Sequence, residues 1–332
     1  MLKKNILILC GGGGSEHDVS LVSANYLEDK LLSLNEYNIY YFILTKDFKF
    51  IDKSKKQYHL DDQKCLIGHG EKIKIDFAIP CIHGIPGETG DIQSYFELIQ
   101  LPYLGAGPEA SKVCFNKITT KLWLERMGID TTPFTYLSSP DFDKVEEFLQ
   151  EHGPLFLKPS NQGSSVGCHK INEINSETKT AIEASFNLSP YALIEKSLKV
   201  RELEVSVFEY DGKVIVTSPG EILPPQEENT FYTFEEKYNE DSHTKTLVQA
   251  KDLSDEQINQ IKTWALKAFK ELKINHLARV DFFLTAQGKL YLNEINTFPG
   301  LTPISMFPKM MENHGVKFQD FLKYNIDHAL LS

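Results

Sequence analysis

The first thirty residues constrain the fold more than any other part of the chain. A short apolar run, Asn5 to Cys10, predicts a buried parallel strand, and four glycines, Gly11 to Gly14, predict a turn directly after it. Apolar side chains then recur at helical spacing at Val19, Val22 and Tyr26. Because strand, turn and helix follow one another in this order, we expect an α/β domain whose loops gather at the strand ends.

The glycine run also allows a second interpretation, as the phosphate loop of a dinucleotide-binding domain. The G-x-G-x-x-G order is not clean, however, and no acidic residue follows the next strand at the expected place. Further strands are predicted at Tyr37 to Leu44 and Ile75 to Ile82, and a helix at Asp91 to Gln100.

Length and charge narrow the class of protein. A chain of 332 residues exceeds one typical domain, so two or three are expected. The net charge of −11 disfavours nucleic acid as a partner, since that needs a basic face. Five cysteines without a C-x-x-C pattern indicate no disulfide framework or zinc ribbon, and favour a reducing, cytoplasmic setting. No apolar run approaches the length of a membrane span, and the run ending at Cys10 is too short for a signal-peptide core.

The rest of the chain alternates between helical and extended patterns. Helices are predicted at Glu109 to Met127, Asp141 to His152, from the capping box at Ser254 to about Lys273, and at Phe318 to Leu330. Strands are predicted at Leu155 to Lys158 and Ala192 to Ser197, with hairpins across Asp211-Gly212 and Ala286 to Gly288. The polar segment Gln226 to Gln249 has little periodicity, and a loop of that length is usually functional or mobile.

Lys158 stands at the end of a predicted strand, before a hydroxyl-rich loop bounded by Gly163 and Gly167. A lysine there can act as a point charge on a phosphate, while loop N–H groups surround the phosphate oxygens. The alternative is an ordinary flexible surface loop, which is the commoner use of Gly and Ser runs. The pattern GxxxxGK[ST] does not occur, so any ATP site must be of another kind than a P-loop.

The second predicted hairpin concentrates oxygen ligands. Because side chains alternate along a strand, Arg279, Asp281 and Phe283 share one face, and Glu294 and Asn296 share a face of the partner strand. If both sets face the same way, they form the all-oxygen cluster that magnesium takes together with substrate phosphates. The alternative is a solvated hairpin face with surface charges.

Glu16 and His83 are expected to meet at the strand ends of the first domain. Glu16 begins a helix where the crevice of an α/β sheet lies, so its carboxylate can hold a substrate ammonium. The alternative is complementation of the helix dipole. His83 ends the third predicted strand; a lone histidine usually serves packing, but the shared strand-end position favours a site.

These residues, in this order, resemble the D-alanine–D-alanine ligases of the ATP-grasp superfamily, over nearly the whole chain. Each motif is weak alone, whereas their joint order and spacing are specific. The motifs are Gly11 to Ser20, His83-Gly84, Lys158 to Gly167, Glu195-Lys196, Glu202, Glu236-Lys237-Tyr238, Arg279 to Asp281 and Glu294 to Gly300.

The resemblance implies three α/β domains: an N-terminal parallel-sheet domain over 1–105, a central ATP-grasp subdomain over 106–195 and a C-terminal one over 196–332. The implied reaction joins two D-alanines through an acyl phosphate, forming D-alanyl-D-alanine, ADP and phosphate for peptidoglycan synthesis. It also implies ATP with two magnesium or manganese ions, small-molecule partners alone, a cytoplasmic location and a homodimer.

The resemblance also implies a role for each matching residue. ATP phosphates would contact Lys117, Lys158, Ser164 and Ser165, and adenine and ribose would contact Glu195, Lys196 and Glu202. The metal ligands would be Asp281, Glu294 and Asn296, and the oxyanion would be stabilised by Arg279 and the N–H of Gly300. Substrate-binding residues would be Glu16, His83, Lys237, Ser305 and Met306. The segment 226–249 would close over the site through a latch of Glu16, Ser164 and Tyr238.

Three positions depart from the family pattern near the amino-acid pockets: Thr89, Phe298 and Pro303. Tyr238 favours the dipeptide product, but the departures leave open D-alanyl-D-lactate, D-alanyl-D-serine or another dipeptide. A nucleotide-binding regulator without catalysis is a further alternative, disfavoured because a mere binder has no need of an oxyanion arginine such as Arg279.

Overall fold

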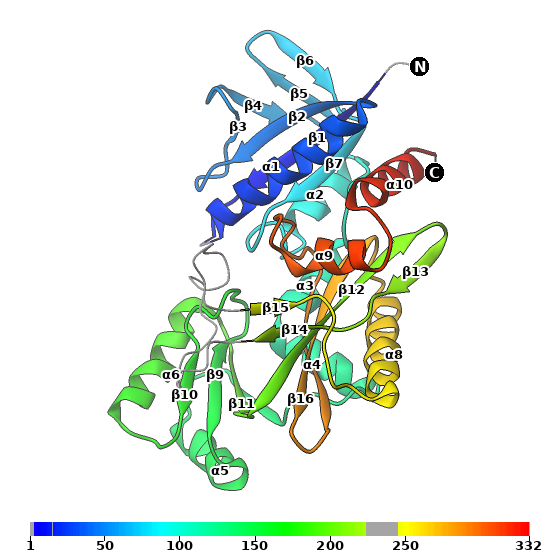
Figure 1. Cartoon of the computed structure of the whole chain (residues 1–332). Coiled ribbons are helices and arrows are strands. Elements are labelled where there is room, and N and C mark those ends of the chain that lie inside the picture. The colour runs from blue at the N-terminus through cyan, green and yellow to red at the C-terminus, as the bar shows by residue number, and fades with distance from the viewer. Residues whose placement is uncertain (1–2, 15, 224–244, 332) are drawn as a thin grey trace.

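The computed structural model describes residues 3–14, 16–223 and 245–331, which form three β-sheets with their covering helices (Figure 1). The N-terminal sheet lies at the top of Figure 1, and the other two sheets lie below it. Within the described residues, no helix combines the length and apolar character needed to cross a membrane.

The N-terminal sheet has seven strands in the order β6-β5-β4-β3-β2-β1-β7. Its strands are β1 Lys4–Gly11, β2 Tyr37–Leu44, β3 Phe50–Asp52, β4 Gln57–Leu60, β5 Cys65–Gly68, β6 Glu71–Lys74 and β7 Phe77–Cys81; its helices are α1 His17–Leu34 and α2 Asp91–Leu98. The predicted first two strands and first helix are confirmed. The sheet is parallel only where β1 pairs with β2 and β7, because the short strands β3 to β6, which we did not predict, extend it in antiparallel fashion.

The predicted helix over Glu109 to Met127 is wrong, because the structure has two helices there, α3 Pro108–Phe115 and α4 Lys117–Arg126. Asn116 separates them with an extended backbone conformation (φ −84°, ψ 105°). Its side-chain oxygen accepts hydrogen bonds from the N–H groups of Ile118 and Thr119 at 3.0 and 3.1 Å. An asparagine that caps a new helix in this way competes with continuation of the old one.

The central sheet has four antiparallel strands in the order β10-β9-β11-β8. Its elements are β8 Phe134–Leu137, α5 Phe142–His152, β9 Leu155–Pro159, β10 His169–Ile171, α6 Ser176–Leu188 and β11 Ala192–Lys196. The predicted strands within β9 and β11 and the helix α5 are confirmed, whereas β8, β10 and α6 were not predicted.

The C-terminal sheet has the order β15-β14-β12-β16-β17, with β13 paired to β12. Its elements are β12 Val200–Tyr210, β13 Lys213–Val216, β14 Gly220–Leu223, β15 Lys245–Leu247, α8 Asp255–Glu271, β16 Leu277–Thr285, β17 Leu290–Asn296, α9 Met306–Asn313 and α10 Phe318–Leu331. Both hairpins and the Ser254 capping box are confirmed. Of the predicted loop Gln226 to Gln249, residues 226–244 lie outside the described part, and the remainder is not all loop, because β15 pairs with β14.

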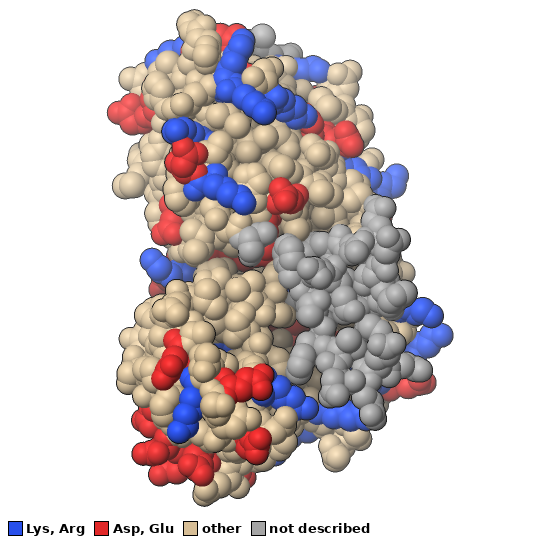
Figure 2. Space-filling model, turned by 90° about the vertical axis from the view of Figure 1, so that its left-hand side faces the viewer, with Lys and Arg blue, Asp and Glu red and all other residues tan. Residues whose placement is uncertain are grey.

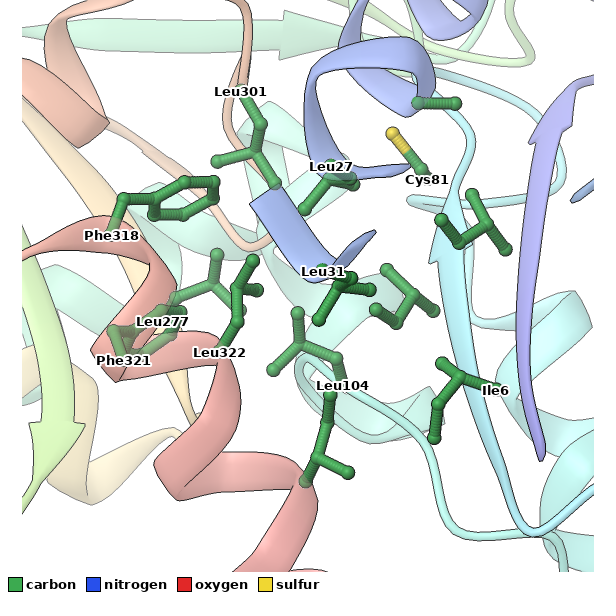
Figure 3. Packing of buried hydrophobic residues seen from close by; sticks show 14 of the residues in the cluster. Ile6, Leu27, Leu31, Cys81, Leu104, Leu277, Leu301, Phe318, Phe321 and Leu322 are labelled. Carbon is green, nitrogen blue, oxygen red and sulfur yellow. The ribbon is translucent and has the colours of Figure 1, made fainter. Parts of the chain in front are cut away.

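The largest hydrophobic cluster joins the beginning of the chain to its end (Figure 3). Leu27 and Leu31 of α1 pack with Phe318, Phe321 and Leu322 of α10, and each of these side chains is fully buried. Helix α10 therefore completes the core of the N-terminal domain from the far end of the sequence.

Leu322→Ala should lower the free energy of unfolding by about 2–5 kcal/mol, because truncation leaves a cavity in a close-packed core. The matched control is Leu331→Ala on the same helix, whose side chain is 88% exposed and whose loss should cost less than about 0.5 kcal/mol. Urea unfolding of both variants measures the difference. Equal midpoints would contradict the role of α10 in the core.

Candidate active site

One cavity of about 830 Å³ collects residues from all three sheets. Every predicted site residue within the described part of the chain lines it: Glu16, His83, Lys117, Lys158, Ser164, Ser165, Glu195, Lys196, Glu202, Arg279, Asp281, Glu294, Asn296, Gly300, Ser305 and Met306. Lys237 and Tyr238 lie outside the described residues. Figure 2 shows acidic and basic side chains over one face of the molecule, with several basic side chains gathered near its top.

Glu16 connects the N-terminal sheet to the loop after β9. It is the N-cap residue of α1, and its side chain makes no capping hydrogen bond. Instead, Ser164 Oγ donates a hydrogen bond to Glu16 Oε1 at 2.6 Å, although the two residues are 148 positions apart. Ser164 and Ser165 both have left-handed backbones (φ 50° and 59°), a conformation that non-glycine residues keep mainly where surrounding structure enforces it.

His83 is fixed beside Glu16 by packing and hydrogen bonds. Its Nε2 lies 2.9 Å from Ser23 Oγ, and its Nδ1 lies 3.7 Å from Glu88 Oε1. Burial raises the pKa of Glu88, an effect that the interaction with His83 partly offsets. The ring of Phe298 lies 6.3 Å from the imidazole, so this departure from the family pattern forms part of the wall of the site.

The predicted phosphate lysine is held by a buried carboxylate. Lys158 Nζ forms an ion pair with Glu195 Oε1, and Lys121 Nζ lies 3.1 Å from Glu195 Oε2. Burial alone would raise the pKa of Glu195, but the two ammonium groups outweigh burial and lower it. Lys117 reaches the same loop, since its Nζ donates a hydrogen bond to Gln162 O at 2.6 Å.

The acidic hairpin is assembled as the alternation predicted. Asp281 stands directly opposite Glu294, and both line the cavity; the strand register shifts just after Asp281. Asn296 Nδ2 donates to Asp281 Oδ2 at 3.0 Å, and Arg279 makes two hydrogen bonds to the Asp281 carboxylate at 2.8 and 2.7 Å. Arg279 Nε also lies 3.3 Å from Glu204 Oε1.

The turn after the hairpin packs against the start of α9. A Cβ added to Gly300 would stand 2.9 Å from Ser305 Oγ, so the glycine allows this close approach. Ser305 is the N-cap of α9 but does not cap it with its side chain. Its hydroxyl instead accepts a hydrogen bond from the Thr302 N–H at 3.1 Å.

The hairpin fits a divalent cation by the chemistry of its donors. Two carboxylates and an amide, all beside the cavity, offer the hard oxygen atoms that magnesium prefers. Within the described ranges, no group of three or more His, Cys, Asp or Glu side chains stands together as a metal site by itself. Magnesium at such sites is commonly held by one or two carboxylates together with substrate phosphates and water.

Three charged residues have no role in the sequence interpretation: Glu88 and Glu204, which line the cavity, and Lys121, which contacts Glu195. Glu204 was visible in the pattern, because it shares a strand face with Glu202 on β12. Lys121 carried a weaker signal, its helical spacing four residues after Lys117. Glu88 gave no such signal.

Three sheets around a cavity with paired lysines and an acidic hairpin define the ATP-grasp class of ATP-dependent ligases, and comparison with known proteins supports this fold. Two family models match the chain, D-ala D-ala ligase N-terminus over residues 5–106 and D-ala D-ala ligase C-terminus over residues 123–327. The D-alanine–D-alanine ligase of Shewanella sediminis is 47% identical over 337 residues and covers 100% of both chains.

Solved structures agree. D-alanyl-alanine synthetase A from Vibrio cholerae superimposes with a TM-score of 0.94 at 45% identity, covering 100% of both chains. D-alanine–D-alanine ligase from Aeromonas hydrophila has a TM-score of 0.82 at 41% identity and covers 96% of this chain and 99% of its own. The chain belongs to the D-alanine–D-alanine ligase family and is an ADP-forming ligase.

Gly163→Ala should lower kcat/KM for ADP formation about tenfold, because misplaced binding groups lose productive geometry. A Cβ at Gly163 would stand 2.9 Å from Glu16 Oε2, so the carboxylate must move away from Ser164. Gly107→Ala is the control, since the nearest atoms lie 3.6 and 3.8 Å away. Equal activity of the two variants would contradict the arrangement.

Proposed function

We propose that this chain joins two D-alanine molecules into D-alanyl-D-alanine for peptidoglycan precursors, converting ATP to ADP and phosphate. The observation that carries the proposal is the shared cavity, in which Glu16, the lysine pair and the acidic hairpin meet. The lysines and the hairpin suit a triphosphate, whereas Glu16 suits the ammonium of an amino acid.

The first half of the reaction transfers the γ-phosphoryl group of ATP to the carboxylate of one D-alanine. Lys117 and Lys158 bind phosphate oxygens, and the loop with Ser164 and Ser165 surrounds them. Positioning and charge neutralisation are what phosphoryl transfer chiefly needs from a protein. The residues that hold adenine and ribose are Glu195, Lys196 and Glu202, which line the same cavity.

The second half is attack by the amine of the other D-alanine on the acyl phosphate, which expels phosphate. Glu16 binds the ammonium of the first D-alanine, and His83 lines the cavity wall beside it. Arg279 and the N–H of Gly300 stabilise the oxyanion of the tetrahedral intermediate. The second D-alanine binds by its carboxylate near the start of α9, where the residues are Ser305 and Met306, with Lys237 from the segment 224–244.

Asp281, Glu294 and Asn296 hold the divalent ions, which we take to be two magnesium or manganese ions. Bound there, such ions would neutralise phosphate charge and stabilise the charge that develops during phosphoryl transfer. The hydrogen bonds of Asp281 to Arg279 and Asn296 pre-orient its oxygen atoms toward the cavity.

Closure of the site involves Tyr238, which joins Glu16 and Ser164 in a latch that excludes water from the acyl phosphate. The Glu16–Ser164 hydrogen bond supports this proposal. We place the domain boundaries after residues 105 and 195, and propose a cytoplasmic homodimer.

Phosphate release from ATP and magnesium tests the reaction directly. With D-alanine alone, we expect release and a product with the mass of D-alanyl-D-alanine. Parallel reactions contain L-alanine, or D-alanine with D-serine or with D-lactate. Turnover with another pair and none with D-alanine alone would overturn the substrate assignment while keeping an ATP-dependent ligase.

Glu294→Ala should lower turnover at least about 100-fold, since metal-assisted charge stabilisation is worth several kcal/mol. The circular dichroism spectrum should stay unchanged, because Glu294 is only partly buried at the cavity. Glu256→Ala on the exposed surface of α8 is the matched control. Near-normal activity of the Glu294 variant with magnesium would contradict the assignment of Glu294 as a metal ligand.

A further inference from the structure

Lys121 is a buried lysine that the proposed reaction does not use. It lies on α4, one helical turn after Lys117, and is 1% exposed. Its Nζ donates hydrogen bonds to Thr131 Oγ1 at 2.6 Å and to Thr132 Oγ1 at 2.7 Å, and lies 3.1 Å from Glu195 Oε2. These three partners match the three N–H donors of an ammonium group.

Glu195 is thus held between two lysines in a symmetric arrangement. Lys158 pairs with its Oε1, and Lys121 lies at its Oε2. Phe156 and Phe134 stand opposite Glu195 on the two neighbouring strands. Lys158 Nζ lies 5.4 Å from the ring centroid of Phe156, and Lys121 Nζ lies 5.4 Å from that of Phe134. Each ammonium group therefore lies near one oxygen atom of the Glu195 carboxylate and near one aromatic ring.

The two lysines differ in access to the cavity. The side chain of Lys158 is 15% exposed and lines the cavity, whereas that of Lys121 is 2% exposed behind Thr132. Burial lowers the pKa of Lys121, with Glu195 countering part of the effect. For Lys158 the attraction of Glu195 outweighs burial, and the pKa is raised. Only Lys158 is placed to meet a ligand in the cavity.

We propose that Lys121 is a positioning residue for ATP: it keeps Glu195 compensated, so that Lys158 can leave the carboxylate and bind a phosphate. Depriving a buried carboxylate of its last counter-ion is strongly unfavourable. With Lys121 present, Glu195 retains one ammonium and the hydrogen bond from Thr132 Oγ1 at 2.9 Å when Lys158 moves. The inference rests on the proposed phosphate-binding role of Lys158.

The test is equilibrium binding of a non-hydrolysable ATP analogue with magnesium, measured by calorimetry on the full chain. Lys121→Met should weaken binding at least about tenfold, because truncating one partner of a buried charge pair is costly. The surface control Lys112→Met, on the exposed face of α3, should bind within about twofold of the parent protein. Unchanged binding by a folded Lys121→Met variant would overturn the proposal.

The double variant Lys121→Met with Glu195→Gln separates charge compensation from packing. Because Glu195 is also assigned to adenine and ribose, this variant is measured with inorganic triphosphate and magnesium, a ligand without those groups. Removing the carboxylate frees Lys158 from its ion pair, so triphosphate binding should recover to within about fivefold of the parent protein. A packing role for Lys121 predicts no recovery. If the single variant does not fold, the double variant still decides: a loss of more than about tenfold there would count against the proposal.

A third variant, Lys158→Met, distinguishes failure of this inference from failure of the proposed function. Weak binding by Lys158→Met together with normal binding by Lys121→Met would refute only the positioning role of Lys121 and would leave the phosphate-binding role of Lys158 in place. Normal binding by Lys158→Met would remove the phosphate-binding role itself, and the inference with it.

Discussion

Compensation of buried charge is the constraint on which this active site depends. Lys158 and Arg279, to which we assign phosphate and oxyanion binding, both form ion pairs with carboxylates: Glu195 for the lysine, and Asp281 with Glu204 for the arginine. With these roles, a phosphate or a developing negative charge would exchange with a carboxylate that the cation already contacts. Ligand binding at such a site is an exchange of partners, whose free energy depends on what each group leaves behind.

Each of the three sheets, with its adjoining segments, contributes a different charged side chain to the cavity. The N-terminal sheet supplies the carboxylate of Glu16, the central sheet supplies Lys158, and the C-terminal sheet supplies Asp281 and Glu294. The Ser164–Glu16 hydrogen bond is a direct link between the first two. The cavity therefore lies where the sheets meet and not within any one of their cores.

Much of this could be predicted from the sequence where the physical signal is local. Continuous apolar runs predicted β1 and β2, and alternation predicted the hairpin that carries Asp281 and Glu294. Strands β3 to β6 were missed because they have three or four residues each, too few for a period of two to stand out even in β4, where burial does alternate. The break at Asn116 was missed because helical spacing continues across it.

The arrangement around Glu195 could not be predicted, because it is a tertiary contact. Lys121, Lys158 and Glu195 come from a helix and two strands, and nothing in their spacing says that one carboxylate serves both lysines. The sequence motifs identified Lys158 and Glu195 separately, with separate roles. Their pairing emerges only from strand register, which places Lys158 on β9 beside β11.

The packing of α10 against α1 has a consequence for how the protein is made. Leu27 and Leu31 are translated long before Phe318 and Leu322, the partners that cover them. Until α10 has been made, α1 presents an uncovered apolar face, which is the kind of surface that chaperones and aggregation both act on. The core that an early segment of the sequence begins is therefore completed only by a much later one.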